Sequence, residues 1–401
     1  MKAELTLKQK EINKYMIMML FFGVGVFVSS IQNVVRSYNS TLLALSYEYG
    51  FTSRSLLGTI YHLIDKILPA NMMDYSKVLL FAQIVTGIFF VFLFVFVYLC
   101  LKRCRVEYIK PCEYIVLFFL LFTIATFSGG YNFFRVDLFM VWVSLLCTLL
   151  IVYEKAEWLV IPLSAIGVMF HQGYVFMFFN VTLVLLFYKF LSGDKKRKWK
   201  YGTLFVVTFL VGSALFLWFE FFSRSNGAAI FDQIAEEAAN LSLNGQYHTT
   251  LLAHEVLGID LSETEQSFRK MNLADISMFT LFFLPYIIVT VRFFVNLLKG
   301  AKTNVDKLKY LAVAIGAATM LPNFILKIDY GRWVLAVITY YALILFALVA
   351  LQDEQIEYQL KETYDWITVK PWAFVFVAYP ILFIPLWDVQ ITGFIQWFYI
   401  K

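Results

Sequence analysis

Long, uninterrupted apolar runs restrict the possible folds of this chain more than any other feature. A helix needs roughly 20 apolar residues to cross the hydrocarbon core of a bilayer, within a range of about 17–25. The runs lack the alternation that marks strands of a transmembrane barrel. They predict an all-α, polytopic transmembrane helical bundle of about 11 spans (10–12), with residues 1–401 in a single membrane domain. The eleven runs are 15–35, 78–101, 113–127, 136–153, 157–170, 172–191, 201–222, 275–298, 308–326, 332–351 and 371–387.

Composition excludes the main alternatives to a membrane protein. Hydrophobic residues make up 61% of the 401 positions and charged residues only 15%, whereas about 25% is usual for a soluble domain. A water-soluble fold of this length cannot hide so much apolar surface. Soluble enzymes, disordered proteins and disulfide scaffolds are therefore excluded. Two runs, 113–127 and 157–170, are short for full spans, so neighbouring helices or a cavity must cover their ends.

The distribution of Lys and Arg predicts the orientation. With a cytoplasmic N-terminus, 22 of the 33 basic residues fall in inner loops or at inner helix ends, as the positive-inside rule requires. The first run, 15–35, is too long for a typical signal peptide and is expected to remain as the first span. The basic residues form no single face, which indicates contact with anionic membrane lipid and no nucleic acid.

Two long loops, 36–77 and 223–274, fall on the outer side in this topology. In the first loop, Ser53 is expected to cap a helix that runs to Pro69 and lies in the membrane interface. Its apolar face has Leu56, Leu57, Ile60, Leu63, Ile64, Ile67 and Leu68, and its opposite face has Arg54, Gly58, His62 and Asp65. The second loop is acidic, and FDQIAEEAAN within it predicts a short helix. This loop is either a lid over a substrate or a solvated connection.

The outer ends of the runs hold most of the out-of-place charges, and ionisable groups near hydrocarbon tend to mark a site. Arg135 and Asp137 open the run 136–153. As helix residues two positions apart they would project to different sides, so each is expected to have another partner. Asp329 and Arg332 are three apart and would share one helix face. Asp329 then either orients Arg332 toward an anionic ligand or forms a plain ion pair with it, and Arg135 either binds such a ligand or extends to lipid headgroups.

Two further residues are candidates for proton transfer. His171 lies in a tight outer turn between apolar runs, where it either transfers a proton or contacts phosphate, or simply caps a helix. Glu48 stands among Tyr47, Tyr49 and Phe51, as a general base or as a solvated loop residue. His248 and His254 are six positions apart and form no metal-ligand pattern. The sequence also lacks the common nucleotide, metalloprotease and hydrolase motifs, so we expect no metal and no cofactor.

Several of these segments resemble bacterial polysaccharide polymerases of the EpsG and O-antigen-polymerase type. The resemblance covers about 200 residues and rests on SGGYNFFRVDLFMVW followed by IGVMFHQGYVFMF, which place Arg135 at the start of one span and His171 in a tight outer turn. YEYGFTSRSLLG and DYGRW are similar to segments of relatives in surface-polysaccharide clusters. The chain departs from EpsG in its first outer loop, which has no Gly-Thr-Asp-x-x-x-Tyr element.

The resemblance implies a GT-C-like membrane glycosyltransferase in the cytoplasmic (inner) membrane of a bacterium. Such enzymes assemble surface polysaccharide, including capsule, from polyprenyl-(pyro)phosphate-linked sugars or oligosaccharides at the outer face, with polysaccharide-assembly proteins as possible partners. The candidates for acid–base catalysis are His171, Glu48 and Asp137. Substrate phosphate would be bound by Arg135, Arg332, Asp329, Arg54, Arg36 and Arg224.

Two other functions stay open from the sequence. A flippase or transporter of lipid-linked oligosaccharide would carry functional charges along a path to both leaflets, whereas the inner halves of these runs are plain. A membrane acyltransferase that modifies a polysaccharide could also use His and Arg near the bilayer. It would usually place the reactive His where a lipid or acyl-CoA donor can reach it.

Overall fold

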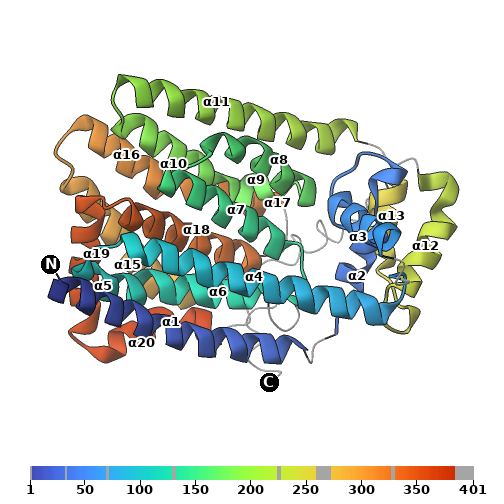
Figure 1. Ribbon diagram of the computed structural model, residues 1–401, viewed down its shortest axis with the longest axis horizontal. Coiled ribbons are helices and arrows are strands. Elements are labelled where there is room, and N and C mark those ends of the chain that lie inside the picture. The colour runs from blue at the N-terminus through green and yellow to red at the C-terminus, as the bar shows by residue number, and fades with distance from the viewer. Residues whose placement is uncertain are drawn as a thin grey trace.

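The computed structural model describes residues 2–31, 34–68, 72–128, 132–223, 227–258, 272–326 and 330–383. Within these ranges the regular structure is entirely helical, with no strand. Figure 1 shows long helices running side by side, with a group of short helices at the end far from the N-terminus. The predicted all-α class is therefore confirmed.

Five helices in the described part of the chain are long and apolar enough to cross a membrane. Shorter apolar helices lie between them: α7 (Asp137–Tyr153), Glu157–Phe170, which includes α8 (Val160–Phe170), and α10 (Phe179–Ser192), which α9 (Tyr174–Met177) precedes. The bundle also contains α1 (Lys2–Ile31), α16 (Asn304–Ile315), α17 (Leu321–Leu326), α19 (Glu354–Thr368) and α20 (Pro371–Phe383). The five long helices are α4 (Tyr75–Arg103), Val106–Phe127, Lys195–Phe222, α15 (Leu273–Lys299) and α18 (Tyr330–Ala350). The third of these contains α11 (Lys195–Leu217).

One short run proved to be part of a full-length helix. The run 113–127 continues a helix that begins at Val106 and passes through α5 (Val106–Cys112), the π-helical stretch η2 (Glu113–Leu117) and α6 (Phe118–Ser128). Pro111 and Glu113 lower the hydropathy of its first turns without ending the helix. The π-helical stretch directly after Pro111 is the kind of local adjustment that accommodates a proline inside a transmembrane helix.

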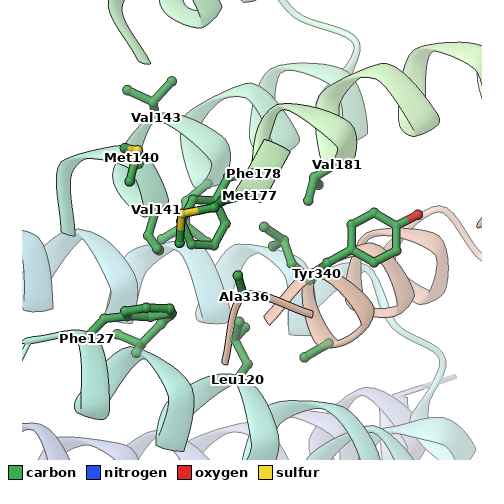
Figure 2. Close-up of a cluster of buried hydrophobic side chains, with 14 of the residues drawn as sticks. Leu120, Phe127, Met140, Val141, Val143, Met177, Phe178, Val181, Ala336 and Tyr340 are labelled. Carbon is green, nitrogen blue, oxygen red and sulfur yellow. The ribbon is translucent and has the colours of Figure 1, made fainter. Parts of the chain in front are cut away.

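Helix α18 forms the centre of the bundle. Of its apolar stretch, 83% is buried, against 22% in α11 and in α15. Figure 2 shows Ala336 and Tyr340 of α18 among side chains from α6, α7 and the α9–α10 region, including Leu120, Val141 and Phe178. By contrast, large apolar side chains of α11 and α15 are exposed, as expected for helices that face lipid. Their apolar character therefore reflects a lipid environment more than a protein core.

The short helices at the far end come from the two predicted outer loops, and we call them the cap. The two loops pack together, because α2 contacts both α3 and α12, and Ser40 shares a hydrogen bond of 2.7 Å with Ser242. The cap comprises α2 (Ser37–Ala44), η1 (Tyr47–Tyr49), α3 (Ser55–Ile67), η6 (Gly227–Ile230), α12 (Phe231–Asn240), η7 (Leu243–Gly245) and α13 (Thr249–Leu257). The predicted helix FDQIAEEAAN is α12.

The predicted amphipathic helix is α3, although its first turn differs from the expectation. The N-cap is Arg54, in a left-handed conformation (φ 65°), and the hydroxyl of Ser53 instead donates to the Gln172 side chain. The face with Gly58 and His62 is buried, whereas much of the apolar face, including Leu63, is exposed. Gly58 permits the close packing, since a Cβ there would lie 1.8 Å from the Leu45 carbonyl oxygen.

Candidate functional site

A buried carboxylate held by two arginines lies where α7 and α18 begin. The side chain of Asp137 is fully buried. Arg332 Nε and Nη2 donate to Asp137 Oδ1 at 2.9 Å and 2.6 Å, and Arg135 Nε lies 3.0 Å from Oδ2. These three side chains carry two positive charges and one negative charge. A buried charge is tolerated when it is paired in this way, and the excess positive charge suits an anionic ligand.

The local backbone explains why the Arg135 side chain reaches Asp137. Helix α7 begins at Asp137, so Arg135 lies in the preceding turn, where its N–H donates to the Asn132 carbonyl at 2.9 Å. Its Nη1 also donates to Asn132 Oδ1 at 3.1 Å. Each residue has another partner, as expected: Arg332 for Asp137 and Asn132 for Arg135. Arg135 and Asp137 also pair with each other, because helical geometry does not apply to Arg135. Phe134, directly before it, is left-handed with φ 63°, and such outliers often accompany functional sites.

Arg332 finds its carboxylate partner far away in the sequence. It lies in the first turn of α18 and is buried, and its partner Asp137 is 195 positions earlier. The alternative partner considered from the sequence, Asp329, lies outside the described residues, as does Arg224. The structure thus links two candidate segments, YNFFRVD and DYGRW, through Asp137 and Arg332.

A third arginine approaches this cluster from the cap. Arg54 Nη1 lies 2.9 Å from Glu255 Oε1 of α13. Burial alone would lower the pKa of Arg54, but nearby Tyr38 and Glu255 more than offset this and raise it, while Arg332 acts in the opposite direction. Tyr38 also lies beneath Arg135, whose Cζ is 5.9 Å from the ring centre. Tyr38 therefore stands near both Arg54 and Arg135.

His171 occupies the turn between α8 and α9 and is buried. Its Nδ1 accepts a hydrogen bond of 2.8 Å from the Gly173 N–H, so in the neutral ring the proton is on Nε2. The next residue, Gln172, accepts from Ser53, the neighbour of Arg54. The preceding residue, Phe170, stacks on Phe139 of α7 with ring centres 5.0 Å apart. The turn is thus fixed between the start of α7 and the loop that carries Arg54.

Two other predicted site residues, Arg36 and Glu48, lie in the cap. Arg36 is exposed at the N-cap of α2. Glu48 is about half exposed and pairs with Lys66 of α3. The hydrogen bond from Lys66 lowers the pKa of Glu48, which makes it a weaker base.

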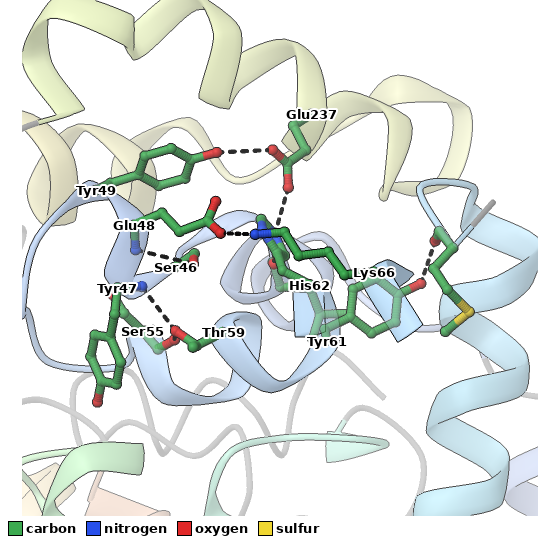
Figure 3. Close-up of polar contacts among 12 residues, drawn as sticks. Ser46, Tyr47, Glu48, Tyr49, Ser55, Thr59, Tyr61, His62, Lys66 and Glu237 are labelled. Atoms are coloured by element: carbon green, nitrogen blue, oxygen red, sulfur yellow. Dashed lines mark hydrogen bonds and ion pairs between the residues drawn. The ribbon is translucent and has the colours of Figure 1, made fainter. Parts of the chain in front are cut away.

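A histidine–carboxylate pair joins the two halves of the cap (Figure 3). His62 Nε2 of α3 lies 2.7 Å from Glu237 Oε1 of α12 and 3.0 Å from the Leu43 carbonyl oxygen. Tyr49 donates to Glu237 Oε2 at 3.3 Å. Burial lowers the pKa of His62, but the hydrogen bond and charge of Glu237 outweigh this and raise it. Sequence spacing gave no sign of this pair, because its members are far apart in the chain.

The arginine cluster is suited to binding an anion and to stabilising developing negative charge. Guanidinium groups offer planar pairs of N–H donors to phosphate or carboxylate oxygens and keep their charge at any working pH. In the described part of the chain, no group of three His, Cys, Asp or Glu side chains could hold a metal ion. No family model, no curated protein and no solved structure matches this chain.

Proposed function

We propose that this protein is a membrane glycosyltransferase that assembles surface polysaccharide from polyprenyl-(pyro)phosphate-linked sugars. In this proposal the chain crosses the cytoplasmic membrane of a bacterium about eleven times, with its N-terminus in the cytoplasm and a GT-C-like arrangement. The cap and the starts of α7 and α18 then face outward. The separation of the cap from the N-terminus along the bundle supports this orientation (Figure 1).

The observation that carries the proposal is the joint position of Arg135, Arg332 and Arg54 around Asp137 and Tyr38. In the proposed orientation they lie at headgroup level, where a lipid-linked phosphate would be. Lys and Arg usually lie on the inner side of membrane proteins, so three close arginines at the outer end call for a ligand. The side chains of Arg54, Arg135 and Arg332 are 17%, 20% and 7% exposed. This burial reduces the screening of their charges by solvent.

In this proposal each residue has a role in glycosyl transfer. The bond from the sugar to the phosphate breaks through an oxocarbenium-like state, and the departing phosphate gains charge that fixed guanidinium groups stabilise. Asp137 positions Arg332 and Arg135. The neutral His171 ring carries its proton on Nε2 and can donate it to an anionic oxygen, so we propose phosphate contact for it over proton abstraction.

Substitution of the arginines tests the proposal in the organism of origin. Arg135→Lys and Arg332→Lys keep the charge but lose the planar fork, and each is expected to shorten the surface polysaccharide severely. Arg135→Ala and His171→Ala should do the same. Arg197→Ala, at an exposed cytoplasmic-end residue of α11, serves as the matched control. Glycan length is read on gels, and membrane abundance by immunoblot. Normal polymer lengths in every variant with normal abundance would contradict the site.

The same experiment separates the alternative functions. A polymerase defect leaves single repeat units on the cell surface, whereas a flippase defect leaves lipid-linked units in the inner leaflet. An acyltransferase defect leaves polymers of normal length that lack acyl groups. Measuring where the lipid-linked units accumulate, and whether the polymer is acylated, therefore assigns the class.

A further inference from the structure

Glu255 is the second carboxylate at the arginine cluster, and it comes from the acidic outer loop. Its side chain is 7% exposed, and its Oε1 lies 2.9 Å from Arg54 Nη1. Glu220, another charged neighbour of Arg54, is exposed to solvent. The exposed His254 side chain lies 3.1 Å from the same Glu255 oxygen. Glu255 thus brings a buried negative charge to the outer side of the cluster.

A carboxylate on a guanidinium has the same chemistry as a phosphate there, because both offer oxygens to the same N–H donors. We propose that Glu255 is an internal occupant of the anion site, which holds Arg54 until a phosphate-bearing ligand displaces it. This inference rests on the proposed function, since it concerns regulation of the same site. In this inference, helix α13 covers the anion site through Glu255 until a ligand binds there.

The way α13 is held makes displacement feasible. It is a nine-residue helix that ends at the left-handed Gly258, and its buried side chains are Leu251, Leu252 and Val256. Its start is tied to α2 by the His248 N–H, which donates to Thr41 Oγ1 at 2.9 Å. The tie to Arg54 is a single close contact. A phosphate presents several oxygens to Arg54 and its neighbours, so it can form more contacts than the single contact between Arg54 and Glu255 that it replaces.

Anion binding to the purified full-length protein tests this inference with two probes. Glu255→Gln keeps the side-chain shape but removes the competing charge, and Glu236→Gln, an exposed carboxylate of α12, is the matched control. We expect Glu255→Gln to bind dodecyl phosphate about 3- to 10-fold more tightly, in line with the net contribution of one typical hydrogen bond. Glu236→Gln should bind as the wild type does. A second arm with inorganic phosphate shows whether a lipid chain is needed for the gain.

The double variant Arg54→Ala/Glu255→Gln should lose the gain, because the gain acts through Arg54. Unchanged or weaker binding by Glu255→Gln, with unchanged thermal stability, would overturn the inference. An equal gain in Glu236→Gln would overturn it as well, since it would indicate a general charge effect. Failure of the proposed function looks different: polymer lengths would stay normal in the arginine variants, while Glu255→Gln would still tighten phosphate binding.

Discussion

Arg332 binds Asp137 through two of its nitrogens at once, with Nε and Nη2 both within 3 Å of Oδ1. The two residues come from the first turns of different helices, and both are buried. The pair therefore fixes the start of α18 against the start of α7. Arg135 adds a second cation to the same carboxylate.

The first prediction concerns the energy of this pair. Removing one partner of a buried ion pair typically costs about 3–5 kcal/mol, and Arg135 remains beside Asp137 when Arg332 is replaced. Asp137→Asn and Arg332→Gln should each lower the thermal unfolding temperature in detergent. The double variant should lose clearly less than the sum of the two, because each single variant already removes the contact between Arg332 and Asp137. Additive losses would show that the pair contributes no coupling energy.

The second prediction concerns the cap and pH. Glu237 raises the pKa of His62 above its usual value, so the stabilisation from this pair is fully present below about pH 6.5. It is lost as the pH rises through the raised pKa. Hydrogen exchange of α12 should therefore be slower at pH 6 than at pH 9, after correction for intrinsic rates. His62→Gln should remove the difference, and a difference that persists in this variant would assign it to another group.

The third prediction concerns the end of the bundle near the N-terminus. Burial raises the pKa of Glu357 in α19 to about 7, with Arg105 opposing and Asp353, Glu107 and Glu354 adding to the rise. In the described part of the chain neither carboxylate oxygen has a hydrogen-bond donor, and Arg105 Nε lies 3.4 Å from one of them. When folding raises the pKa of a carboxyl group, the group stabilises the fold at pH values below its pKa in the unfolded chain. That stabilisation is lost as the pH rises through the folded-state pKa, here about 7.

We therefore expect the packing of α19 against α5 to weaken between pH 5 and pH 8, by up to about 3 kcal/mol. Hydrogen exchange of α19 measures this change directly. Glu357→Gln imitates the protonated form and should keep α19 equally protected at both pH values. If the wild type shows no pH dependence there, the carboxyl group is charged throughout and the prediction fails.

The sequence predicted the class of fold well because apolar periodicity is a local property. Helix α12 appears where its ten residues predicted it, and α3 keeps its predicted faces. The extent of the helix at 106–127 was missed, because hydropathy falls at Pro111 and Glu113 whereas the backbone stays helical. The N-cap of α3 was missed as well, because Ser53 is used by Gln172 across the molecule.

The candidate site was found only in part, for a physical reason. Arg135 and Arg332 stood out because charges are rare beside apolar runs. The partner of Arg332 is 195 positions away, and the pair of Arg54 and Glu255 spans the two outer loops. The spacing of residues within one segment cannot predict contacts between segments so far apart in the sequence. Glu255 was one of seven carboxylates in an acidic loop, and only packing distinguishes it from the others.

The long separations within the arginine cluster also impose an order on its assembly during synthesis. Asp137 emerges from the ribosome nearly 200 residues before Arg332, and Arg54 emerges as far ahead of Glu255. Until α18 is inserted, Arg135 is the only one of the two cations that can neutralise the Asp137 carboxylate. About half of the chain is therefore synthesised while Asp137 has only one of its two arginines, and the cluster closes only when α18 arrives.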